Sequence, residues 1–511
     1  MTDTHSNEEL TAAAATGVRW TTVVRVVTEV LLLGSMIVLA RLIPPSAFGM
    51  FAVAIIVQEL AVTVPSEGVG SALVQRRSVD RAHLQGGFAL ALLVGAGLTL
   101  VTLALAAVVV NPIFGFETAR LVALTTPWFM LGAIVALPLT ILRRRLEFGR
   151  VALLGLVQSV VRAGSSIFFA AALGLDAEAL VFGGVLGMFA MVAVALVFAP
   201  VPLPRWRGRA VRDLLPYGGP AMLACFSWVG FRNGDYAIVG ARLGAAQAGF
   251  YWRGFQLAVE YQGKLSAVMN QVAFPVLSRT ASMDDLFAMR RRMVRTLTVG
   301  LFPLLASLVV LAPVIVPWLF GPAWEPAVVP TQILAGAGAA TVVIDAVGSV
   351  LMATGRTRAM LLYGVAHFTV YVAAILFASR YGLTAVCIAA VSIHLIFALV
   401  AYSVLLRGRA DRTLRFFWDD VGAATISCAA LAAVAVPVNL ALDPADLAPV
   451  LQLLIVSGVA AAAYLSALRI GFPAAFRDLR GLMRRVVPVR RLGTALRRVV
   501  RPRRAASSAA S

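Results

Sequence analysis

The chain has 511 residues, of which 60% are hydrophobic and only 13% are charged. A water-soluble protein cannot bury that much apolar surface, and apolar stretches of roughly 20 residues, long enough to cross a bilayer as helices, recur throughout. The formal net charge of +20 is large enough to suggest nucleic-acid binding, but the positions of the arginines, described below, favour another explanation. The composition therefore predicts an all-α polytopic membrane protein.

Residues 1–17 are polar and lack the basic start and short apolar core of a cleavable signal, so we interpret them as a cytoplasmic N-terminal tail. Fourteen apolar windows follow and are predicted to be transmembrane helices. Their approximate bounds are 18–40, 47–72, 86–110, 120–141, 151–173, 178–199, 217–240, 246–275, 297–319, 327–352, 359–378, 384–406, 418–440 and 449–469. The connecting loops are short, so no large domain is expected outside the membrane.

Arginine is distributed unevenly between alternate loops. If the N-terminus is cytoplasmic, the loops on that side contain 22 arginines, and those on the other side contain only Arg41, Arg120, Arg242 and Arg380. Cytoplasmic loops of membrane proteins carry an excess of Lys and Arg. The pattern therefore predicts a protein of the cytoplasmic (inner) membrane with both termini in the cytoplasm, and no nucleic-acid partner is expected.

The C-terminal tail, residues 471–511, is basic and mixes Leu, Val and Met with Arg. Two interpretations stay open: an amphipathic helix lying on the anionic inner leaflet, or a disordered basic extension. The first makes anionic phospholipid an expected partner of the tail.

Two similar turns indicate an internal repeat. "ARLIPPSAFGMF" (40–51) returns as "ARLGAAQAGFYW" (241–252), with six predicted spans between the copies. Because six is even, both copies enter the membrane in the same direction, which predicts two parallel six-helix lobes. The turn itself is interpreted as a structural joint, since prolines at the start of a helix sacrifice no hydrogen bond. The predicted domains are an N-lobe (18–200), a cytoplasmic linker (201–216), a C-lobe (217–406), two extra helices (407–470) and the tail (471–511).

Ionisable residues inside predicted spans are costly and need an explanation. Eight are candidate substrate-binding residues: Arg25, Glu29, Arg162, Arg232, Asp235, Arg253, Glu260 and Lys264. One interpretation is a set of self-neutralising pairs that stabilise packing: Arg25 with Glu29, Arg232 with Asp235, and Glu260 with Lys264. The other is a hydrophilic cavity between the lobes whose cations bind an anionic substrate.

Other residues in the spans carry weaker signals. Tyr236, Tyr251 and Trp252 could stack on sugars or belong to an ordinary interfacial aromatic belt. His367 and His394 lie in apolar spans and are interpreted as core or lipid-facing residues. The sequence contains no catalytic constellation and no metal-ligand spacing, so no catalytic residue, metal or cofactor is predicted.

Several segments, in order, carry a resemblance to a known family. They include "LARLIPPSAFGMFAVA", "LRRRLEFGRVALLGLVQSVV", "YGGPAMLACFSWVGFRNGDYAIVGARLGAAQAGFYWRGFQLA" and "LFGPAWEPAVVPTQILA". Together they resemble the polysaccharide-export flippases of the multidrug/oligosaccharidyl-lipid/polysaccharide exporter superfamily, in particular the capsule and exopolysaccharide transporters similar to the colanic-acid exporter. The resemblance covers residues from about 17 to 410.

The resemblance implies an alternating-access transporter that moves undecaprenyl-pyrophosphate-linked oligosaccharide between leaflets for capsule, exopolysaccharide or O-antigen-type synthesis. In that case Arg25, Arg162, Arg232 and Arg253 would hold the pyrophosphate, balanced by carboxylates that could also sense a coupling proton or sodium ion. Polysaccharide polymerase and other assembly proteins are further candidate partners. Three alternatives stay open: a drug or metabolite antiporter of the same superfamily, an integral-membrane glycosyltransferase or ligase, and a non-transporting scaffold.

Overall fold

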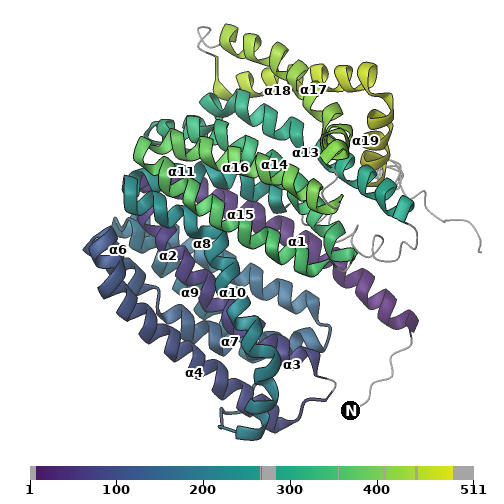
Figure 1. Cartoon of the computed structure of the whole chain (residues 1–511). Coiled ribbons are helices and arrows are strands. Elements are labelled where there is room, and N and C mark those ends of the chain that lie inside the picture. Colours follow the sequence, from purple (N-terminus) through teal and green to yellow (C-terminus); the bar gives the residue numbers. More distant parts are fainter. Residues whose placement is uncertain are drawn as a thin grey trace, which may run out of the picture. The chain divides into compact units, whose positions relative to one another are not determined.

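The computed structural model describes residues 7–76, 78–264, 266, 283–354, 356–406, 410–442 and 447–486. Every regular element within these ranges is helical (Figure 1). Among the described residues, twelve helical segments are long and apolar enough to cross a membrane. The prediction of an all-helical polytopic membrane protein is therefore confirmed.

Twelve of the fourteen predicted spans coincide with these segments. The other two, 217–240 and 246–275, fall on α10 (Gly208–Leu243) and on α11 (Ala245–Phe255) with its continuation. Part of the span 246–275 lies outside the described residues, so the total of fourteen stays a prediction.

The chain divides into two compact units that do not follow the predicted lobes. The first unit comprises Met1–Phe255, Pro313–Thr331 and Phe368–Ala390. Its complete helices are α1 (Asn7–Leu42), α2 (Pro45–Pro65), α3 (Ser71–Gln75), α4 (Arg81–Leu105), α5 (Asn111–Phe114), α6 (Phe116–Leu124), α7 (Pro127–Arg144), α8 (Phe148–Leu173), α9 (Ala177–Phe198), α10 and α11. The unit also contains the short helical turn η4 (Pro322–Ala327) and the ends of four helices that continue into the second unit.

Helix packing in the first unit centres on α7, α8 and α9. Trp128, Leu142, Leu154 and Met188 are almost completely buried in one apolar cluster there. Helix α8 packs along both α9 and α1, and α2 packs against α7, α10 and α11. Helix α1 is therefore attached to the first unit through α8.

The second unit comprises Gln256–Ala312, Gln332–His367 and Val391–Ser511. It contains most or all of α13 (Met283–Phe320), α14 (Val328–Ala353), α15 (Thr357–Ala378), α16 (Leu383–Leu405), α17 (Ala410–Leu442), α18 (Pro449–Gly471) and α19 (Pro473–Val486). Helix α17 packs along α18, and Tyr464 of α18 donates a hydrogen bond to the carbonyl oxygen of Val299 on α13, at 2.8 Å. The appended helices are thus attached to α13.

The first part of the basic tail is helical and strongly amphipathic over α19. This agrees with the amphipathic-helix interpretation for residues 473–486. The remainder of the tail, 487–511, lies outside the described residues.

Candidate functional site

The turn between α1 and α2 is fixed to the end of α13 and to η4 by two side chains, each of which donates to main-chain carbonyl groups of the other segment. Helix α2 begins at Pro45, with Pro44 in the N-cap position, as the sequence predicts. The guanidinium of Arg41 donates to the carbonyl oxygens of Trp318 and Leu319, at the end of α13. In return, the indole Nε1 of Trp324 donates to the carbonyl oxygen of Ala40, at 2.8 Å. These contacts agree with the interpretation of this turn as a structural joint.

The two copies of the repeated turn pack directly on each other. A Cβ atom added to Gly49 of α2 would lie 1.7 Å from the carbonyl oxygen of Ala245, and one added to Gly249 of α11 would lie 2.1 Å from that of Pro45. Only glycine fits where two backbones approach so closely. The contact is reciprocal, because each copy contributes one glycine, and in the aligned copies the two glycines lie one position apart.

Arg253, a candidate pyrophosphate ligand, is enclosed by aromatic rings. Its side chain is completely buried. The guanidinium carbon lies 4.8, 5.7, 4.7 and 4.7 Å from the ring centroids of Phe48, Trp252, Phe320 and Trp324, respectively. A cation at this distance from a ring is attracted by the negative face of the π-system. We call these five residues the aromatic cage.

Asp235 is held by two tyrosines rather than by Arg232, the partner considered from the sequence. Its carboxylate accepts hydrogen bonds from the hydroxyl groups of Tyr251 and Tyr371, both at 2.9 Å. The backbone N–H of Tyr236 donates a third bond, at 3.0 Å. The cluster therefore connects α10 to α11 and to the second half of α15.

The other candidate residues lie on several helices. Arg25 on α1 is exposed, whereas Glu29 on α1, Arg162 on α8 and Arg232 on α10 are half-buried. Helix α9 comes close to Arg162 because Gly187 has no side chain. These residues, with Asp235 and Arg253, belong to the first unit.

Glu260 and Lys264 belong to the second unit and are half-buried. The ammonium of Lys264 lies 5.1 Å from the ring centroid of Tyr261. His367 and His394, also in this unit, are in contact: their ring centroids are 5.1 Å apart, and His367 stacks on Phe397. This histidine contact is not apparent from the sequence, because the two residues lie on different spans.

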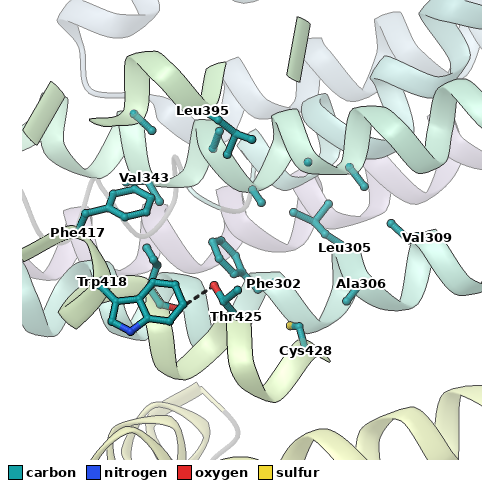
Figure 2. Close-up of a pocket in the computed structure, with 16 residues that line it drawn as sticks. Phe302, Leu305, Ala306, Val309, Val343, Leu395, Phe417, Trp418, Thr425 and Cys428 are labelled. Atoms are coloured by element: carbon teal, nitrogen blue, oxygen red, sulfur yellow. Dashed lines mark hydrogen bonds between the residues drawn. The ribbon is translucent and has the colours of Figure 1, made fainter. Parts of the chain in front are cut away.

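The second unit also contains an apolar cavity of about 380 Å³ between α13, α14, α16 and α17 (Figure 2). Phe302, Leu305, Val343 and Leu395 contribute to its lining. The hydroxyl of Thr425, which also lines the cavity, donates to the carbonyl oxygen of Val421 on the same helix (Figure 2). The cavity therefore offers a surface suited to hydrocarbon.

A buried ion pair connects α13 to the appended helix α17. Arg290 pairs with Asp420, and the hydroxyl of Tyr402 donates to the same carboxylate, at 2.6 Å. Nearby, Arg295 pairs with Asp478 of α19. From the sequence, Arg290 and Arg295 were predicted to lie in a loop, but α13 begins at Met283 and includes both.

Comparison with known proteins decides the family. A family model described as "Polysaccharide biosynthesis protein" matches residues 38–329, more than half of the chain. The chain belongs to this family. The matched region of this polysaccharide biosynthesis protein includes both copies of the turn and the whole aromatic cage.

Individual relatives agree with the family. The protein is 25% identical over 405 residues to the lipopolysaccharide biosynthesis protein WzxC of Escherichia coli K12, which covers 76% of this chain and 80% of WzxC. It is 29% identical over 145 residues to the teichuronic acid biosynthesis protein TuaB of Bacillus subtilis 168, covering 27% of this chain and 30% of TuaB.

Among solved structures, the lipid II flippase MurJ in an inward closed conformation matches with a TM-score of 0.71 and 14% identity, covering 89% of this chain and 98% of MurJ. An inward-facing multidrug resistance MATE transporter matches with a TM-score of 0.58 and 16% identity, covering 76% and 95%. These similarities show the fold: the chain has the helical architecture of these two solved proteins.

Proposed function

We propose that this protein flips undecaprenyl-pyrophosphate-linked oligosaccharides across the cytoplasmic membrane for the synthesis of a capsule, exopolysaccharide or O-antigen-type glycan. The observation that carries this proposal is the match to the polysaccharide biosynthesis family over residues 38–329. The similarity to WzxC along 76% of the chain supports it. No covalent chemistry is required of the protein, only different stabilisation of inward- and outward-facing states.

Charged side chains of the first unit would hold the pyrophosphate in this mechanism. Arg25, Arg162 and Arg232 supply guanidinium groups, which bind phosphate oxygens in a bidentate manner. Glu29 and Asp235 balance their charge and are the candidates for sensing a coupling ion. The roles of Glu260 and Lys264 in substrate binding stay predictions.

The apolar part of the substrate needs a separate surface. The cavity between α13, α14, α16 and α17 is lined mainly by carbon (Figure 2). An isoprenoid chain is long and uncharged, and a carbon-lined cavity accommodates it without desolvating polar groups. We assign the lipid tail to this cavity.

The arginine distribution supports an inner-membrane location with both termini in the cytoplasm. In that orientation the amphipathic α19 lies at the inner leaflet. Arg477 and Arg480 of α19 are then placed to bind anionic headgroups. A polysaccharide polymerase is the expected protein partner, because it uses the flipped units.

The test is polymer export in cells that depend on this gene. Replacing Arg25 and Arg232 by Ala should stop export while the protein still accumulates in the membrane, because the pyrophosphate loses its ligands. Arg81→Ala is the control, since Arg81 is exposed at the start of α4. Undiminished polymer output from the Arg25/Arg232 variant would contradict the assignment of these residues.

The same cells separate the alternatives. Loss of the gene with normal polymer but new drug sensitivity would favour an antiporter. Sugar transfer from lipid to acceptor by the purified protein would favour a glycosyltransferase.

A further inference from the structure

We infer that the aromatic cage is a latch that closes the outer end of the transport path and opens once in each cycle. The inference rests on the proposed transport function. Its starting point is that Arg253 is completely buried among Phe48, Trp252, Phe320 and Trp324, rather than exposed to a substrate path.

The cage is assembled from segments distant in sequence. Phe48 comes from α2 and Trp252 from α11, while Phe320 is the last residue of α13 and Trp324 belongs to η4. Burial removes water from the guanidinium, which is costly unless other groups replace the lost hydration. Four ring faces contribute to this replacement only when all these segments are together, so the cage stabilises one arrangement of them.

All five cage residues belong to the first compact unit, but they come from both lobes predicted from the repeat. Phe48 lies in the predicted N-lobe, and the other cage residues lie in the predicted C-lobe. The hydrogen bonds of the joint cross in the same way, from Arg41 to the end of α13 and from Trp324 to Ala40. Reciprocal glycines bring α2 and α11 into backbone contact beside the cage.

All these contacts lie at one membrane face. The α1–α2 turn, the α10–α11 turn and the α13–η4 turn each follow an odd-numbered predicted span, so they emerge on the same side. That side holds only four of the loop arginines, which identifies it as the outer side. Closure there separates the transport path from the outside.

The chemistry of the cage suits a contact that has to reopen. When the segments separate, the guanidinium regains hydration, which offsets the loss of the ring contacts. The bonds from Arg41 to main-chain carbonyls likewise exchange with water at small net cost. An apolar side chain at position 253 would lack this compensation, because opening would only expose apolar surface.

Two variants of Arg253 therefore shift the latch in opposite directions. Arg253→Ala removes the ring contacts and leaves a void, so the open population should rise about tenfold, the order expected for desolvated cation–π contacts. Arg253→Met fills the same space without a charge, so the open population should fall and transport should slow. Arg242→Ala is the matched control, because Arg242 is exposed at the same face.

The experiment measures distances between spin labels at Ser46, beside the α1–α2 turn, and Ala323, in η4. The full-length protein is used in nanodiscs, with the native cysteines Cys225, Cys387 and Cys428 replaced by Ala. A longer-distance population that grows in Arg253→Ala and shrinks in Arg253→Met, with no change in Arg242→Ala, supports the latch.

Trp324→Phe is the second variant in case Arg253→Ala does not fold. It keeps a ring but loses the bond to Ala40, so a severalfold rise is expected. Unchanged distances in a folded Arg253→Ala or Trp324→Phe protein would overturn the latch. Because the labels report conformation without substrate, this failure is distinct from an absence of flipping activity.

Discussion

The ion pair between Arg290 and Asp420 allows a prediction with an internal control. Both side chains are buried, 1% and 0% exposed. One residue earlier, Asp419 pairs with Arg291, but these side chains are 37% and 45% exposed. The two aspartates thus share a helix and a type of partner, and differ in burial.

Asp420→Asn preserves shape but leaves the buried guanidinium of Arg290 without a compensating charge. Breaking a buried pair in this way costs about 3–5 kcal/mol. Asp419→Asn breaks an exposed pair, which contributes at most about 1 kcal/mol. We therefore expect the two variants to differ by at least about 2 kcal/mol, or roughly thirtyfold in the unfolding equilibrium constant.

The assay is equilibrium unfolding of the purified protein in detergent micelles, titrated with denaturant and followed by tryptophan fluorescence. The double variant Arg290→Met/Asp420→Leu should regain much of the lost stability, because an apolar pair replaces the ionic one. Equal destabilisation by Asp419→Asn and Asp420→Asn would refute the reasoning.

Three further substitutions test other contacts. Gly49→Ala should lower the free energy of unfolding by about 1–3 kcal/mol, because the new Cβ would lie 1.7 Å from a backbone oxygen of α11. Gly97→Ala is the control, since a Cβ there meets nothing within 4 Å, and similar melting temperatures for both variants would contradict the close contact of α2 and α11. Tyr371→Phe removes one hydrogen bond to the carboxylate of Asp235, so a loss of about 1.5–3 kcal/mol is expected in the same denaturant titration, and an unchanged midpoint would count against the bond. Arg356→Met removes two hydrogen bonds to the last carbonyls of α16, so hydrogen exchange should accelerate at that helix end, and unaltered protection would argue against the cap.

The sequence predicted the helices well because each span is marked by its own local hydropathy. Their ends were predicted less well. Helix α13 begins at Met283, fourteen residues before the predicted span 297–319. Its first turns carry arginines, and hydropathy detects only the part of a helix that lies in the apolar layer. The pairing of Arg290 with Asp420 shows why these turns form: their charges are satisfied by another helix.

The sequence suggested individual residues for the candidate site, and their role stays a prediction, but it did not indicate which residues they contact. Asp235 and Arg253 stand out because a charge in an apolar span is rare. Their partners Tyr371, Phe320 and Trp324 do not, since an aromatic residue near a membrane surface is common. Which of them meets a given charge depends on packing between segments far apart in sequence, and one sequence alone does not contain that information.

The repeated turn gave the most useful local signal. Each copy contributes one glycine, Gly49 or Gly249, one position apart in the alignment, and the structure places the two in reciprocal contact. The repeat predicted two related lobes; the packing of its two copies on each other is a finding of the structure.

The central claim is that this protein moves a lipid-linked oligosaccharide between leaflets. The direct measurement is leaflet exchange of labelled undecaprenyl-pyrophosphate oligosaccharide in liposomes that contain the purified protein, with and without proton or sodium gradients. Our account predicts exchange that requires the protein, changes with a gradient and is lost when Arg25 and Arg232 are replaced by Ala. Exchange no faster than in protein-free liposomes, under every gradient, would contradict it.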